Sequence, residues 1–119
     1  MKRVLFVDDD DAILELYRRV FTGEGYTVVT CLTMEDARAH LADEGFDAVV
    51  LDIRLAEGSG LALLREIKTE SKHLPVILST AYARYQDDFS SWLADEYVVK
   101  SADLVELKNA LRRHLGRGT

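Results

Sequence analysis

The sequence alternates short apolar runs with segments of helical periodicity, and this alternation is its strongest constraint on the fold. Strands buried on both faces require unbroken apolar runs such as Val4–Val7 and Ala48–Leu51, as in parallel sheets. The predicted strands are Val4–Val7, Tyr26–Thr30, Phe46–Leu51, Pro75–Ser79 and Tyr97–Val99.

Between the strands, apolar residues recur every three or four positions, which predicts one-sided helices. The first helix begins near Asp11, ends before Gly25, and is expected to turn Ile13, Leu16, Tyr17, Val20 and Phe21 inward. Further helices are predicted after Thr33, after Gly58–Gly60 and from Ala102, with a short or irregular helix over Arg84–Ala94.

Strand and helix alternate along the whole chain, so we predict the α/β class and a single domain over residues 1–119. The expected architecture is a doubly wound parallel five-stranded sheet with helices on both faces. Five strands in one small domain fit the flavodoxin-like order 2-1-3-4-5.

The net charge of −6 argues against direct nucleic-acid binding, which needs a basic surface. The single cysteine, Cys31, allows no intrachain disulfide. We find no signal peptide and no apolar stretch of membrane-spanning length, so the expected localisation is cytoplasmic, without membrane contact.

Polar residues follow four of the predicted strands. They are Asp8 and Asp9, Asp52, Thr80, and Lys100. Ligand sites in parallel α/β sheets form beyond the carboxyl ends of the strands, so we expect three carboxylates in one pocket, with a hydroxyl and an ammonium on its rim. Crowded carboxylates need a cation, and Mg²⁺ binds such oxygens together with phosphoryl groups. The pattern indicates phosphoryl transfer.

In this arrangement the residues resemble the response-regulator receiver family, also called CheY-like. The resemblance rests on Phe6–Asp10, Leu51–Arg54, Gly60, Ser79–Ala81 and Tyr97–Lys100, and it runs along nearly the whole chain.

The resemblance implies that Asp52 accepts a phosphoryl group from a histidine kinase or phosphotransfer protein. It also implies that Asp9, Asp52 and the backbone carbonyl of Arg54 bind Mg²⁺ directly, and that Asp8 acts through a water. Lys100 would pair with Asp52 and then with a phosphoryl oxygen. Such a protein is a signalling phosphoacceptor that assists its own phosphorylation and dephosphorylation, not a turnover enzyme.

The resemblance further implies a conformational switch. Thr80 would bond the phosphoryl group, Ala81 would leave space for it, and Tyr97 would swing inward. The surface formed by the fourth helix, the fifth strand and the last helix would then change for an unknown downstream partner, and dimerisation through it stays open. Ser101 stands where the family usually has a proline, often in a cis peptide, so we expect the bond after Lys100 to be trans or the loop to be rebuilt. Ala56 replaces another family proline.

Two other functions stay open. Asp8-x-Asp10 resembles the nucleophile pair of haloacid-dehalogenase-type phosphohydrolases, which would place the phosphoryl group on Asp8. The altered loops also suit a receiver-fold interaction module that is never phosphorylated.

Overall fold

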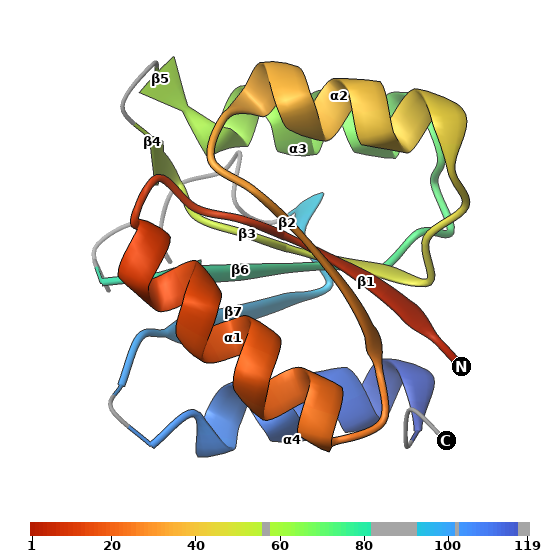
Figure 1. Ribbon diagram of the computed structural model, residues 1–119. Coiled ribbons are helices and arrows are strands. Elements are labelled where there is room, and N and C mark those ends of the chain that lie inside the picture. The colour runs from red at the N-terminus through yellow and green to blue at the C-terminus, as the bar shows by residue number, and fades with distance from the viewer. Residues whose placement is uncertain (56–57, 82–92, 102, 117–119) are drawn as a thin grey trace.

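The computed structural model describes residues 1–55, 58–81, 93–101 and 103–116 as a twisted parallel sheet between two pairs of helices (Figure 1). The sheet consists of β1 (Arg3–Val7), β2 (Thr27–Cys31), β3 (Ala48–Leu51), β6 (Val76–Thr80) and β7 (Glu96–Val99). Its order is β2-β1-β3-β6-β7, with every pair parallel. This confirms the predicted flavodoxin-like order, since the two remaining strands form a separate hairpin.

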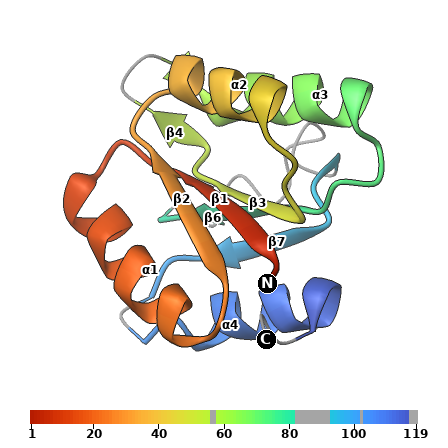
Figure 2. The same cartoon turned by 45° about the vertical axis from the view of Figure 1, so that its right-hand side comes forward.

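Helices α2 (Met34–Asp43) and α3 (Gly60–Glu70) cover one face of the sheet, and α1 (Asp11–Gly23) and α4 (Val105–Leu115) cover the other (Figure 2). Three of them begin at a side-chain cap. Asp10 accepts hydrogen bonds from the backbone of Ala12 and Ile13, and Thr33 and Ser59 cap α2 and α3 in the same way. The start of α2 directly after Thr33 agrees with the prediction from the sequence.

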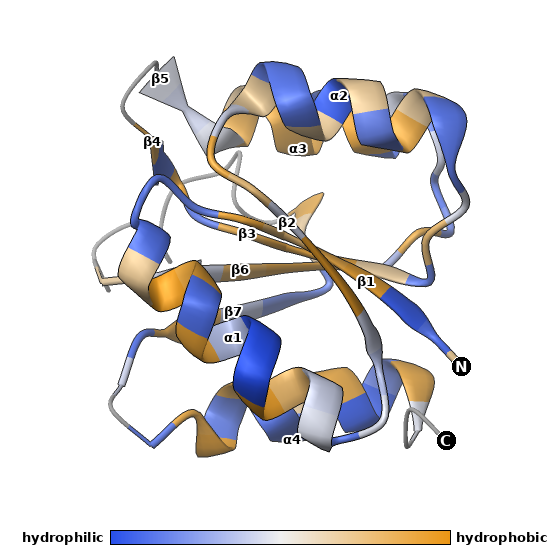
Figure 3. Cartoon of the chain, viewed as in Figure 1, coloured by the Kyte–Doolittle hydropathy of each residue, from blue (hydrophilic) through white to orange (hydrophobic). Residues whose placement is uncertain are grey.

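The core consists of two apolar clusters, one on each face of the sheet. Figure 3 shows the apolar character of the central strands and the two-sided character of the helices. Successive β1 residues alternate between the clusters, because neighbouring side chains on a strand point to opposite faces. Leu5 and Val7 join the aliphatic cluster under α2 and α3, whereas Val4 and Phe6 join the aromatic cluster under α1 and α4.

The predicted inward face of α1 is partly wrong. Tyr17 and Phe21 are buried as expected, and Leu14, which was not predicted, is buried with them. Ile13, Leu16 and Val20 are only partly buried and flank the core. The apolar arc of this helix is wide, and the packing against β1 decides which part of it faces the sheet.

The chain after β3 contains an unpredicted antiparallel hairpin, β4 (Arg54–Leu55) with β5 (Gly58–Ser59). The predicted short helix over 84–94 falls almost entirely outside the described residues, as do Ala56 and Ala102. All described peptide bonds are trans, as predicted for the bond after Lys100. No helix in the described part of the chain is long and apolar enough to cross a membrane.

Candidate functional site

The carboxyl ends of β1 and β3 bring the predicted carboxylates together. The two strands are neighbours, and the Asp52 N–H donates to the Val7 carbonyl at 3.0 Å. Asp52 therefore leaves the sheet beside Asp8, which follows Val7. One carboxylate oxygen from each of Asp8, Asp9 and Asp52 lies within 4.8 Å of the others. The predicted proximity of the three carboxylates is thus confirmed.

Lys100 supplies the positive charge of the cluster. Its backbone N–H donates to the carbonyl of Thr80 at 2.7 Å, which holds the residue at the carboxyl end of β7. Its Nζ lies 2.6 Å from Asp8 Oδ2 and 3.0 Å from Asp52 Oδ2. The sequence predicted the pair with Asp52. The shorter bond to Asp8 is new, and it makes the ammonium a bridge between the two strand ends.

The cluster is buried unevenly. The exposed fraction is 2% for Asp8 and 7% for Asp52, whereas Asp9 is exposed to solvent. Burial raises the pKa of Asp8, although the bond from Lys100 opposes the shift. Burial by itself would lower the pKa of Lys100, but the bonds to both carboxylates outweigh it, so the net shift is upward. The ammonium is therefore charged at every physiological pH.

Each buried carboxylate has a second hydrogen-bond partner, a backbone N–H, in addition to the Lys100 ammonium. Asp8 Oδ1 accepts from the N–H of Asp10 at 2.9 Å, and Asp52 Oδ1 accepts from the N–H of Arg54 at 3.3 Å. The bond from Arg54 is slightly longer than the usual range for an N–H donor and an oxygen acceptor. It also keeps the backbone of Arg54, whose carbonyl was predicted as a metal ligand, next to Asp52.

The predicted switch residues lie on the adjacent strands. Thr80 is fully buried at the end of β6. Tyr97 pairs in register with Leu78 and is partly buried against the aliphatic cluster. Movement of either residue is not tested by these positions and stays a prediction. Ala81 is exposed.

A pair of hydroxyls near the cluster was missed in the sequence. Tyr17 Oη lies 3.3 Å from Ser79 Oγ, and both residues are buried. Burial raises the pKa of the Tyr17 phenol, which also feels the charges of Lys100, Asp8 and Asp52. The available signal was a hydroxyl-bearing tyrosine on an otherwise non-polar inward face, about one and a half helical turns after the aspartate run.

Gly60 contacts the Asp52 backbone more closely than any other residue type could. Its N–H donates to the Ile53 carbonyl at 2.6 Å. A Cβ at this position would stand 2.0 Å from the Asp52 carbonyl oxygen. The glycine therefore lets α3 begin directly against the end of β3.

Comparison with known proteins identifies the arrangement. The response regulator receiver domain family matches residues 4–112. The crystal structure of response regulator protein TrrA from Thermotoga maritima, in complex with Mg²⁺ and beryllium fluoride, has a TM-score of 0.93 and 43% identity, and covers 97% of this chain and 100% of that one. A structure of TrrA in complex with histidine kinase ThkA has a TM-score of 0.91 at the same identity, over 97% of this chain and 99% of that one.

Curated relatives are longer. Transcriptional regulatory protein ZraR of Salmonella typhimurium is 31% identical over 94% of this chain. Regulatory protein AtoC of Escherichia coli is 34% identical over 97%. The chain spans about a quarter of the length of these relatives. With the family match over most of its length and the acidic cluster at its strand ends, this chain belongs to the response regulator receiver domain family.

Proposed function

We propose that this chain accepts a phosphoryl group on Asp52 from the phosphohistidine of a partner histidine kinase or phosphotransfer protein. The observation that carries the proposal is the cluster of Asp8, Asp9 and Asp52 with Lys100 held between two of them. The TrrA structure with histidine kinase ThkA supports the class of phosphoryl donor.

The proposed step is a displacement at phosphorus. A carboxylate oxygen of Asp52 forms a bond to the phosphorus while the bond from phosphorus to the imidazole nitrogen breaks, and the electron pair of that bond returns to the imidazole. The product is an acyl phosphate on Asp52. Such transfers depend on positioning and charge neutralisation more than on acid–base chemistry.

Asp52 is the best nucleophile of the three carboxylates. Asp8 is held by the shorter bonds, to Lys100 at 2.6 Å and to the Asp10 backbone at 2.9 Å. The bonds of Asp52 are longer, at 3.0 and 3.3 Å, so its oxygens exchange partners at lower cost. Lys100 stands ready to bond the phosphoryl oxygens as the charge on Asp52 is consumed, and Thr80 is the predicted hydroxyl donor.

The donor set suits a magnesium ion. Asp8, Asp9 and Asp52 offer hard oxygen atoms that lie close enough together to surround one cation. Asp9, Asp52 and the backbone carbonyl of Arg54 are the proposed direct ligands, and Asp8 would act through a water. When bound, Mg²⁺ neutralises charge on the phosphoryl oxygens. The Mg²⁺ and beryllium fluoride in the TrrA structure support this choice.

Phosphorylation is proposed to act on a surface that includes β7 and α4, through Thr80 and Tyr97. An added phosphoryl group brings about two negative charges and strong acceptors, which draw a nearby hydroxyl. A downstream protein or output domain would read the change, and a homodimer through the same surface is a further proposal. We also propose a cytoplasmic location and no direct contact with nucleic acid or membrane.

Mass spectrometry after incubation with acetyl phosphate tests the proposal. We expect a Mg²⁺-dependent gain of one phosphoryl group in the wild type and none in Asp52→Ala. A gain retained in Asp52→Ala and lost in Asp8→Asn would instead support the phosphohydrolase-type nucleophile. If beryllium fluoride and Mg²⁺ also leave the amide NMR signals around Asp52 unchanged, the chain is an interaction module that is not phosphorylated.

A further inference from the structure

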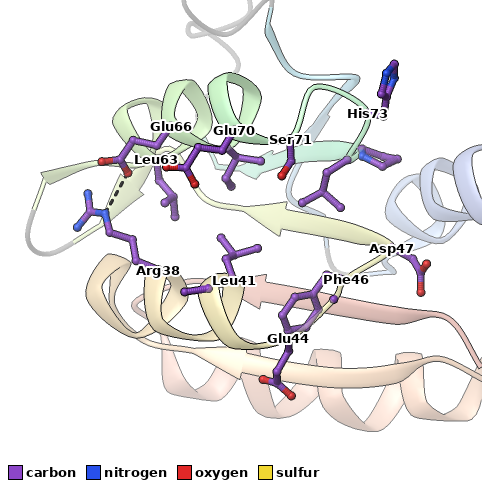
Figure 4. A pocket seen from close by; sticks show the side chains of 15 residues that line it. Arg38, Leu41, Glu44, Phe46, Asp47, Leu63, Glu66, Glu70, Ser71 and His73 are labelled. Atoms are coloured by element: carbon purple, nitrogen blue, oxygen red, sulfur yellow. Dashed lines mark hydrogen bonds and ion pairs between the residues drawn. The ribbon is translucent and has the colours of Figure 1, made fainter.

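The structure contains a cavity of about 700 Å³ at the edge of the sheet opposite the acidic cluster. We name it the α2–α3 groove, after the two helices that border it (Figure 4). Its volume is in the range of small-molecule sites. The residues that precede β3 and β6 also line it, so it lies at the amino ends of these strands, whereas Asp52 lies at the carboxyl end of β3.

The interior of the groove is apolar. Leu63 and Ile67 are buried members of the aliphatic cluster, and Leu41, Phe46 and Leu74 pack partly exposed against it. An ion pair between Arg38 and Glu66, 3.0 Å from Nε to Oε2, links α2 to α3 beside the groove.

The rim is acidic. Glu44, Asp47, Glu66 and Glu70 line the groove, against a single guanidinium, that of Arg38. Glu44 and Glu66 are paired with basic side chains, and Asp47 accepts a backbone N–H. Within the described part of the chain Glu70 has no partner, so its carboxylate is available to a ligand.

The helix dipoles add to the negative electrostatic potential of the acidic rim. Because helices in a parallel α/β sheet run opposite to the strands, α2 and α3 both end beside the groove, at Asp43 and Glu70. The unsatisfied carbonyls at a helix C-terminus carry about half a negative charge and favour a cation there. Side chains and backbone therefore select the same sign of ligand.

We propose that the α2–α3 groove binds a small organic cation with an apolar body, such as an aryl-alkyl amine. The apolar part would contact Leu41, Leu63 and Ile67, and the ammonium would lie against Glu70 and the C-terminus of α3. This site is separate from the acidic cluster, so its occupation does not depend on phosphorylation of Asp52.

Titration of the ¹⁵N-labelled full chain with 4-phenylbutylamine tests the proposal, and 4-phenylbutyrate, with the same apolar body and opposite charge, is the matched probe. We expect saturable amide shifts confined to the segments that line the groove, residues 38–47, 63–67 and 70–75, with a Kd on the order of 1 mM for the amine. The acid should bind at least about tenfold more weakly. Equal binding of both probes, or shifts spread over the surface, would overturn the proposal.

Three variants separate the site from general attraction to an acidic protein. Glu70→Gln should weaken amine binding about two- to fivefold, as expected for an exposed ion pair. Glu15→Gln, on the exposed side of α1, makes the same charge change far away and should leave binding unaltered. Ala42→Trp, at an exposed lining position, should fill the groove and abolish the shifts while the beryllium fluoride response is retained. The assignment would be refuted if Glu15→Gln weakened amine binding as much as Glu70→Gln, or if Ala42→Trp bound the amine as well as the wild type. If a Leu-Lys-Leu-Lys peptide bound more tightly than the amine, the groove would instead be a docking site for a protein.

Discussion

Replacing Gly60 by alanine tests how closely the phosphoacceptor segment depends on the start of α3. The added Cβ would stand 2.0 Å from the carbonyl oxygen of Asp52, and ordinary van der Waals contact begins at 3.4 Å. The two backbones must therefore separate by roughly 1.4 Å, since no flexible side chain can yield in their place. Overpacking costs about 1–3 kcal/mol, and loss of the Gly60–Ile53 hydrogen bond adds about 0.5–1.5 kcal/mol.

We expect Gly60→Ala to lower the free energy of unfolding, measured in urea, by about 1.5–4.5 kcal/mol. A displacement of about 1 Å at a reacting group can cost 100-fold in rate, so phosphorylation of Asp52 by acetyl phosphate should slow by about 10- to 100-fold. Gly23→Ala is the matched control, because a Cβ there has no neighbour within 4 Å. It should be neutral, or stabilising by up to about 1 kcal/mol. Equal urea midpoints for the two variants, with a wild-type phosphorylation rate in Gly60→Ala, would refute the close-approach argument.

Three further predictions concern separate parts of the molecule. Mg²⁺ at ten times its Kd should stabilise the wild type by about 1.4 kcal/mol. Calorimetry should show that Asp9→Asn loses most of this gain, and because the Asp9 side chain is exposed, the variant should still fold. An equal gain in both proteins would exclude Asp9 as a ligand. Burial raises the pKa of the Cys31 thiol to about 11, so at pH 8 it should react with a disulfide reagent roughly 100-fold more slowly than an ordinary cysteine, and fast labelling of the native protein would contradict the buried position. Tyr26→Phe removes the 2.9 Å bond to the carbonyl of Gly116 and should cost about 0.5–1.5 kcal/mol in urea unfolding without changing phosphorylation; a variant as stable as wild type would mean that water replaces the bond.

The sheet was predictable because its strands leave unusually clear signals. Runs such as Ala48–Leu51 are apolar at every position, and the observed strands differ from the predicted ones by one or two residues at their ends. The rotation of α1 about its axis was less predictable, since six large apolar residues spread over a wide arc and only packing selects Leu14 over Ile13. The hairpin of β4 and β5 has two residues in each strand, too few for any periodic pattern.

The acidic cluster was predictable for a different reason. Each of its members lies within two residues of the end of a predicted strand, so the topology alone brings them to one edge. What the sequence did not contain is the detail that depends on side-chain reach. Lys100 lies closer to Asp8 than to Asp52, and Tyr17 bonds Ser79. The α2–α3 groove was equally invisible, because a cavity arises where side chains from distant segments fail to meet.

The alternation of β1 between an aliphatic and an aromatic layer ties the position of Asp8 to distant packing. The ring of Phe6 lies 5.1 Å from that of Tyr17 and 5.2 Å from that of Phe21, centre to centre. If β1 slipped by one residue, Phe6 would be forced among the aliphatic side chains and Leu5 among the rings. The same slip would carry the Asp8 carboxylate about 3.3 Å along the strand, beyond the reach of the Lys100 ammonium. The aromatic contacts thus fix the register of β1 and with it the position of the Asp8 carboxylate. Mutations that loosen these contacts should displace Asp8 from Lys100 before they unfold the protein.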